Sequence, residues 1–420
     1  MDDKADNTAG NSVAPATNRR LTGDGTAEIL FSLRWLEGAI RHCCIHFGQR
    51  VSMWRDIFPP AIYDQLVDRE QSAEATSSLT ESDFHAPYDN RLLIALRAEQ
   101  FQPVIRQNGQ QLTPQPGRFY PQGFLRGVPG IFASSTAAAR FVGHDRDRLV
   151  FDLNHPLAGH ALHVTARIEK IVSAKTERGG RCEHWLETMS AAGPGMQCRY
   201  QNRPTHFFDA PPLPRIDERP DGQFYHQPRL VHHLDERARL LLSNQYGDLI
   251  ETGADVLDLM ASWESHLPES LAVSSLTVVG LNEVELHRNP RATNHLVHDL
   301  NELPLLPLAD AACDVIICTA SIEYLIDPVA VLKEAGRLLR PGGTLIISFS
   351  NRWFAPKTIT LWPELHECER LGFVRELLEQ AGCFTIGSTT TIRGYPRPED
   401  DPYPELPHAD PLFIITAHKK

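Results

Sequence analysis

The sequence predicts an α/β domain with a doubly wound, mostly parallel sheet, preceded by a mainly-β domain. After Leu234, helical segments alternate with short strands that are apolar throughout, as in a parallel sheet covered by helices on both faces. Before residue 175, strands with alternating apolar residues dominate. We therefore divide the 420 residues into four parts. These are a disordered lead (1–25), a mainly-β domain (26–175), an irregular Pro- and Gly-rich connection that includes a lid (176–235) and the α/β domain (236–420).

The first elements follow from local patterns in the mainly-β part. Alternating apolar residues over 29–35 predict a strand, and Glu37-Gly38 predicts a hairpin turn into a second strand. Residues 61–67 follow two prolines and predict one short helix. A second hairpin is predicted from two strands and the turn between them, at residues 148–152, 161–168 and 154–159.

The C-terminal part reads as a regular series of helices and strands. Its predicted elements are helix 236–250, strands 255–259, 276–281 and 314–318, helix 327–339 and strand 344–349.

Composition excludes several classes of protein. Lys and Arg number 41 against 53 Asp and Glu, a net charge of −12, which argues against a nucleic-acid coat. The sequence contains no apolar stretch of the roughly 18 residues that a membrane span requires, and the polar N-terminus is unlike a signal peptide. We expect a cytoplasmic protein that acts on a small molecule or a protein and binds neither nucleic acid nor membranes.

Metal binding is not expected from the spacing of the usual ligands. The eight cysteines form no Cys-x-x-Cys pair, and their scatter indicates reduced, mostly buried thiols. His155, His160 and His163 lie close in sequence, but alternation along a hairpin would place them on different faces. The site prediction therefore includes no metal.

Polar residues follow the strands of the predicted parallel sheet. In such sheets, ligands bind beyond the carboxyl ends of the strands near the point where the strand order reverses. Asp258 lies in the first strand, Asn282 follows the second, and Asp299 follows the third. Acids placed there have few structural reasons for their position, so we expect Asp258 and Asp299 to contact a ligand.

The order of further motifs resembles the class I S-adenosylmethionine-dependent methyltransferases over about residues 236–420. These motifs are Cys313-Asp314-Val315-Ile316, Ile322-Glu323-Tyr324-Leu325-Ile326-Asp327-Pro328 and Leu338-Leu339-Arg340-Pro341-Gly342-Gly343. The resemblance implies a Rossmann-like methyltransferase fold and S-adenosyl-L-methionine as cofactor. It also implies that Asp258 lies near the methionine or ribose part, Asn282 replaces the acid that holds the ribose, and Asp299 accepts from the adenine amino group. Ala261, Ser262 and Leu300 complete the implied cofactor site.

Two features depart from that family. The usual glycine-rich loop after the first strand is Met260-Ala261-Ser262-Trp263-Glu264, and side chains there hinder a close approach of the backbone to a ligand. Asn282 lacks the charge of the usual acid. These departures keep a second interpretation open, a non-catalytic scaffold that has lost its cofactor.

Substrate-side candidates lie in the loops after the fourth and fifth strands. They are Ser321, Glu323, Tyr324, Asn351, Arg352 and Trp353. Tyr225, Arg229 and His232 are candidates for a lid over the cofactor. Each residue also has a structural interpretation, such as capping a helix or packing at the edge of the core. Because the family mainly aligns the nucleophile with the methyl group and the sulfur, we assign no catalytic residue.

The segment Phe151-Asp152-Leu153-Asn154-His155-Pro156-Leu157-Ala158-Gly159-His160-Ala161-Leu162 is similar to the last hairpin of the SlyD-type FKBP prolyl isomerases. The similarity covers about residues 26–172 and implies a mainly-β FKBP-like domain with a peptide-binding groove, for which Phe31, Trp54 and Tyr88 are candidates. Ile57-Phe58-Pro59-Pro60 and Phe84-His85-Ala86 depart from the family pattern. The expected function is thus a methyltransferase of unknown acceptor with an accessory peptide- or protein-binding domain. A prolyl isomerase or folding helper is the further alternative.

Overall fold

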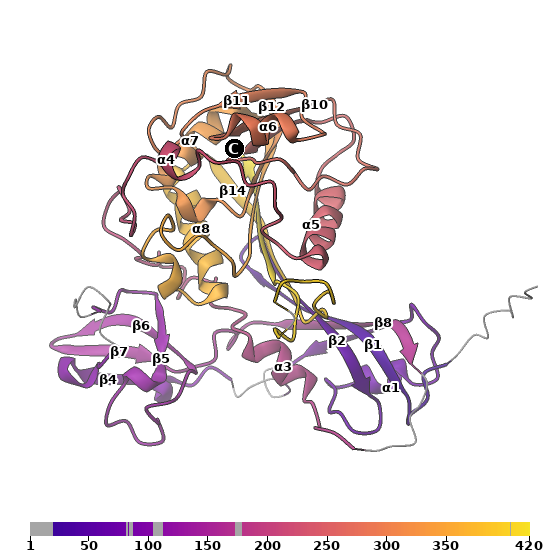
Figure 1. The fold of residues 1–420 in the computed structure, drawn as a ribbon. Coiled ribbons are helices and arrows are strands. Elements are labelled where there is room, and N and C mark those ends of the chain that lie inside the picture. Colours follow the sequence, from indigo (N-terminus) through magenta and orange to yellow (C-terminus); the bar gives the residue numbers. More distant parts are fainter. Residues whose placement is uncertain (1–19, 81–82, 84–86, 104–111, 173–178, 404) are drawn as a thin grey trace, which may run out of the picture.

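One sheet of eleven strands runs through the protein (Figure 1). The computed structural model describes residues 20–420 except 81–82, 84–86, 104–111, 173–178 and 404. The strand order of the large sheet is β11-β10-β9-β12-β13-β15-β14-β2-β1-β8-β3, and a separate sheet has the order β4-β7-β6-β5.

The C-terminal part supplies the first seven strands of that order. They are β9 (Asp255–Leu259), β10 (Ser275–Gly280), β11 (Asn294–Val297), β12 (Cys313–Thr319), β13 (Leu339–Phe349), β14 (Phe384–Arg393) and β15 (Leu412–Lys419). Strands β9 to β13 pair in parallel, whereas β15 pairs antiparallel with both β13 and β14. The predicted parallel sheet is thereby confirmed.

Helices cover both faces of this half of the sheet. They are α5 (Glu236–Leu249), α6 (Glu283–Arg288), α7 (Pro328–Leu338) and α8 (Glu367–Ala381). Buried residues of α7 and α8 belong to one apolar core and those of α5 and α6 to another. The neighbours Ile316 and Ile317 of β12 point into different cores, as alternate strand residues must. This doubly wound arrangement explains why the central strands β9, β10, β12 and β13 bury apolar residues on both faces.

The N-terminal strands extend the same sheet. They are β1 (Thr26–Glu37), β2 (Ile40–Ser52), β3 (Glu74–Leu79) and β8 (Leu162–Val172), with α1 (Ile62–Leu66) beside them. The predicted first hairpin is confirmed, because β1 and β2 pair antiparallel and Gly38 has the positive φ of 58° that the turn requires. β2 pairs in parallel with β14 from Arg41↔Ser388 to His46↔Arg393. The two parts of the chain therefore share one sheet.

The predicted second hairpin is wrong. Its first strand, β7 (Arg148–Asp152), lies in the small sheet with β4 (Leu93–Arg97), β5 (Phe119–Pro121) and β6 (Ala138–Asp145). Its second strand, β8, pairs with β1 and β3 instead. Both edges of β7 and of β8 already have partners, so residues 154–159 connect two sheets.

The predicted lead is too long at its C-terminal end. Leu21 is fully buried in the N-terminal core, and its N–H donates to the carbonyl of Arg69. Residues 1–19 of the lead and Phe84-His85-Ala86 lie outside the described residues. Within its described residues, 179–235, the connection has the two short helices α3 (Trp185–Ala191) and α4 (Asp221–Phe224). None of the described helices is long and apolar enough to cross a membrane.

Candidate functional site

The strand order reverses beside β9. The chain runs outward from β9 to β10 and β11 and then returns to place β12 on the other side of β9. The carboxyl ends of these strands border the expected ligand crevice. The segments that follow them contain every predicted cofactor residue except Asp258, which lies within β9 itself.

Asp258 is buried and carries an altered pKa. Burial raises the pKa of its carboxyl to about 7, against a hydrogen bond from Ser265 that lowers it. Ser265 is in turn held by the side chain of Asn289, whose Nδ2 donates to Ser265 Oγ at 2.8 Å. Asp258 therefore holds the segment after β9 in place through its hydrogen bond with Ser265.

That loop keeps a glycine-like backbone without a glycine. Met260 has a φ of 58°, a left-handed conformation that favours glycine. The N–H of Ala261 donates to the carbonyl of Val279 in β10 at 2.7 Å, and Ser262 Oγ donates to Glu285 at 2.6 Å. A Cβ at Gly280 would lie only 2.3 Å from the Ala261 carbonyl oxygen. The glycine that permits close packing of this loop thus lies on the neighbouring strand.

Asn282 caps α6 and also holds the chain segment above it. Its Oδ1 accepts from the N–H of Glu285, and its Nδ2 donates to the carbonyls of Tyr225 at 2.9 Å and His226 at 3.1 Å. Both amide hydrogens are therefore used. The spacing Asn282-x-x-Glu285 is a helix-start pattern, so the capping role could have been recognised in the sequence.

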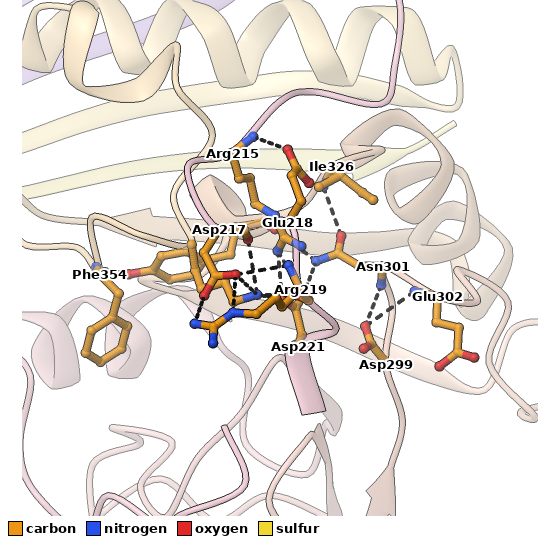
Figure 2. A network of polar contacts seen from close by, with 12 residues as sticks. Arg215, Asp217, Glu218, Arg219, Asp221, Asp299, Asn301, Glu302, Ile326 and Phe354 are labelled. Atoms are coloured by element: carbon orange, nitrogen blue, oxygen red, sulfur yellow. Dashed lines mark hydrogen bonds and ion pairs between the residues drawn. The ribbon is translucent and has the colours of Figure 1, made fainter. Parts of the chain in front are cut away.

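Asp299 and Leu300 follow β11. Asp299 is half-buried, and its Oδ1 accepts from the N–H groups of Asn301 at 2.9 Å and Glu302 at 3.4 Å, as Figure 2 shows. Leu300 is buried in the apolar core beneath. Asp299 thus presents a carboxylate on a fixed turn at the edge of the crevice.

The substrate-side candidates differ in burial. Glu323 and Tyr324 lie in the short helix Ile322–Tyr324 after β12, and both are buried. Tyr324 accepts a hydrogen bond from the N–H of Phe354 at 2.8 Å. Asn351 is exposed, and its Oδ1 accepts from Ser350 Oγ at 3.4 Å.

Three other substrate-side candidates have structural contacts. Ser321 donates to the carbonyl of Thr319, Arg352 pairs with Asp410 at 2.8 Å, and Trp353 lies under the guanidinium of Arg370. These contacts match the structural interpretation of these residues.

The predicted lid residues contact the segments that follow β9 and β10. The N–H of Arg229 donates to Glu285 at 2.6 Å, and the Arg229 guanidinium lies over the rings of Phe224 and Phe354, at 4.6 and 5.2 Å from their centroids. His232 contacts Glu264 of the loop after β9 at 2.9 Å. Residues 225–232, here called the lid segment, are therefore bound to the loops after both β9 and β10.

A buried ionic network fixes the chain just before the lid segment (Figure 2). Asp221 lies at its centre and pairs with Arg215 at 2.9 Å and with the fully buried Lys357 at 3.0 Å. Asn301 donates to Asp221 at 2.7 Å and to the carbonyl of Tyr324 at 2.9 Å. The network joins the connection to the loops after β11, β12 and β13, and sequence patterns did not indicate it.

A cavity of about 300 Å³ lies on the N-terminal side of the protein. Tyr88, Phe119, Tyr200 and the buried Arg140 line it, together with residues 154–156 and 158–160. Of the three groove candidates, Tyr88 alone lines this cavity. Phe31 is fully buried in the core against Trp185, at 5.0 Å between ring centroids.

Comparison with known proteins finds similarity to methyltransferases in the C-terminal part. Residues 268–347 match the methyltransferase domain family, beginning just after the glycine-free loop. A relative from Mycolicibacterium smegmatis named "Probable S-adenosylmethionine-dependent methyltransferase" is 40% identical over 89 residues, which are 21% of this chain and 34% of the relative. A malonyl-[acyl-carrier protein] O-methyltransferase from Hahella chejuensis is 32% identical over 102 residues, 24% of this chain and 36% of that protein. The chain thus spans about a third of the length of these curated relatives.

Solved structures also align with this part of the chain. The [4+2]-cyclase SpnF aligns with 50% of this chain and 99% of its own, at 18% identity and a TM-score of 0.37. An S-adenosylmethionine-dependent methyltransferase from Mesorhizobium loti aligns with 42% of this chain and 96% of its own, at 14% identity and a TM-score of 0.30. The family match over residues 268–347 and these relatives support a methyltransferase-like domain in the C-terminal part. The relative from Mycolicibacterium smegmatis is named as dependent on S-adenosylmethionine.

The residues that follow β9, β10 and β11 fit that cofactor in part. Asp299 offers a carboxylate acceptor, and Met260 keeps the left-handed turn without glycine. Asn282, however, donates both amide hydrogens to the lid segment. A ribose could take hydrogen bonds from this amide only after residues 225–226 move.

Proposed function

We propose that this protein is an S-adenosylmethionine-dependent methyltransferase whose acceptor is a small molecule or a protein. The observation that carries the proposal is the reversal of strand order at β9, with Asp258 and Asp299 beside it, in a segment that overlaps the methyltransferase match. When bound, the cofactor would supply an electrophilic methyl group. Asp299 would orient the adenine, and the lid segment would exclude water from the reacting atoms.

Titration calorimetry with S-adenosylmethionine and S-adenosylhomocysteine tests this proposal. Wild-type protein should bind both ligands, and Asp299→Ala should weaken binding about tenfold, because an acceptor worth about 1–3 kcal/mol is lost. Glu302→Ala is the matched control, since Glu302 is the exposed neighbour on the same turn. Absence of binding by the wild type would favour the scaffold interpretation. Equal affinities of the wild type and Asp299→Ala would refute the role of Asp299.

We propose, second, that the N-terminal part is an FKBP-like accessory unit that binds an extended peptide or protein segment. The aromatic side chains of Tyr88, Phe119 and Tyr200 in the 300 Å³ cavity support this role. Fluorescence anisotropy with a labelled proline-containing peptide should show binding that Tyr200→Ala weakens. Accelerated refolding of a proline-limited protein would add isomerase activity to the binding role.

We also propose a cytoplasmic location. All eight cysteines are free in the structure, and five of them are buried. Eight cysteines without a disulfide bond support a reducing compartment. Fractionation of the native host cell tests the location directly, and recovery of the protein outside the cytoplasmic fraction would contradict it.

A further inference from the structure

Three side chains from distant parts of the chain meet under the N-terminal sheet. They are Glu37 at the end of β1, His42 in β2 and Cys198 in the connection. His42 Nε2 lies 3.5 Å from Glu37 Oε2 and 3.9 Å from Cys198 Sγ. Among the described residues, this is the only group of three or more His, Cys, Asp or Glu side chains whose ligand atoms all lie within 4.8 Å of one another.

The surrounding side chains orient each of the three groups toward the others. Thr389 Oγ1 lies 2.7 Å from His42 Nδ1, so when Nδ1 carries the proton, Nε2 directs a lone pair into the cluster. The indole N–H of Trp35 donates to Cys198 Sγ at 3.3 Å. Metal-binding imidazoles and thiolates commonly have such outer partners.

The carboxylate of Glu37 is also fixed, and it retains acceptor capacity. Its Oε2 accepts from Arg375 at 2.6 Å, and its Oε1 accepts from the N–H of Arg199 at 3.1 Å. Each carboxylate oxygen has two lone pairs. Oε2 can therefore contact Arg375 on one side and a cation on the other.

The cluster borders the N-terminal cavity, because Cys198 is also part of the cavity lining. A water molecule from that side could complete a four-coordinate site, and an ion could enter by the same route. One sulfur, one imidazole nitrogen and one carboxylate oxygen form a donor set typical of Zn²⁺ with an open fourth position. We propose that Glu37, His42 and Cys198 bind one Zn²⁺ ion beside the cavity. Binding displaces the thiol proton of Cys198 to solvent.

Metal loading of the full-length protein tests the site. Protein loaded with Zn²⁺ and desalted should retain one additional ion per chain compared with Cys198→Ser, as measured by inductively coupled plasma mass spectrometry. Co²⁺ should give a thiolate-to-metal charge-transfer band that is absent in Cys198→Ser. Competition with a chromogenic chelator should show affinity for Zn²⁺ at least 100-fold weaker in Cys198→Ser and His42→Gln.

Two further variants separate ligation from folding. Thr389→Val removes the outer partner of His42 and should weaken Zn²⁺ binding about 10- to 100-fold while the Co²⁺ band remains. Cys313→Ser alters another buried thiol, whose Sγ donates to the carbonyl of Leu338, and should leave Zn²⁺ affinity unchanged. Circular dichroism verifies that each variant is folded. Equal zinc content and affinity in wild type and a folded Cys198→Ser would overturn the site, as would a wild type that retains no zinc.

Discussion

Glu323 is a buried acid in the short helix that follows β12. Its side chain is fully buried, and neither of its oxygens accepts a hydrogen bond from another described residue. Burial raises its pKa to about 7, although the charge of Arg370 lowers it. A buried acid without a hydrogen-bond partner is costly when charged. Glu323 is therefore a better candidate for a functional carboxyl than for a stabilising one.

This raised pKa predicts a specific pH dependence of stability. The unfolded chain titrates Glu323 near its ordinary value of 4.5, and the folded protein titrates it near 7. Between these values the folded state binds more protons, so the free energy of unfolding falls as pH rises, by about 1.4 kcal/mol per unit. Above pH 7 no further loss occurs.

Urea unfolding of wild type and Glu323→Gln from pH 4 to 9 measures this contribution. The free energy of unfolding of the variant, relative to that of the wild type, should rise between pH 4.5 and 7. The total rise should be about 3 kcal/mol, and it should persist at higher pH. The exposed Glu251→Gln should show no such gain. A difference between Glu323→Gln and wild type that does not vary with pH would contradict the raised pKa.

At the scale of elements, one residue links the start of α6 to the lid segment. Asn282 Oδ1 caps the helix while Nδ2 holds the carbonyls of Tyr225 and His226. The family resemblance implies a ribose-binding acid at this position. The same side chain thus serves as a helix cap, a contact of the lid segment and a candidate cofactor contact.

Asn282→Asp should separate these roles. A carboxylate keeps the cap but repels the two carbonyls, so we expect faster tryptic cleavage after Arg229. Affinity for S-adenosylhomocysteine should rise about tenfold, because a charged acceptor becomes free for the ribose. Calorimetry and timed proteolysis give the two readouts, and Asn282→Ala, which also loses the cap, is the comparison. A lid segment that loosens without any gain in affinity would remove Asn282 from the cofactor site.

At the scale of the whole molecule, the two halves are joined by backbone pairing and by buried ion pairs. β2 and β14 pair over six residues on each strand, from Arg41↔Ser388 to His46↔Arg393. Arg375 of α8 contacts Glu37 of β1 at 2.6 Å, and Arg118 beside β5 contacts Glu369 of α8 at 3.4 Å. Separation of β2 from β14 would expose the unpaired edges of both strands.

Native-state hydrogen exchange tests whether the shared sheet unfolds as one unit. Amides of Cys44 in β2 and Thr390 in β14 should exchange with the same free energy and the same dependence on denaturant. Earlier opening of β2 would show instead that the N-terminal strands form a separate unit, as the predicted boundary at residue 175 implies.

The sequence by itself determined six elements of the α/β domain, which correspond to α5, β9, β10, β12, α7 and β13. Apolar strands, helical spacing and acids near strand ends are local patterns, and the predicted helix 327–339 corresponds to α7, which Asp327 caps. The same local signals predicted the first hairpin.

Only the tertiary structure decided which strands pair and which distant side chains meet. The turn at residues 154–159 reads as a hairpin, yet its strands belong to different sheets. The pairing of β2 with β14, the hold of Asn282 on the lid segment and the meeting of Glu37 and His42 with Cys198 join residues far apart in sequence. Such contacts leave no periodic trace in the chain, because strand partners and buried polar clusters are selected by the packing of the whole protein.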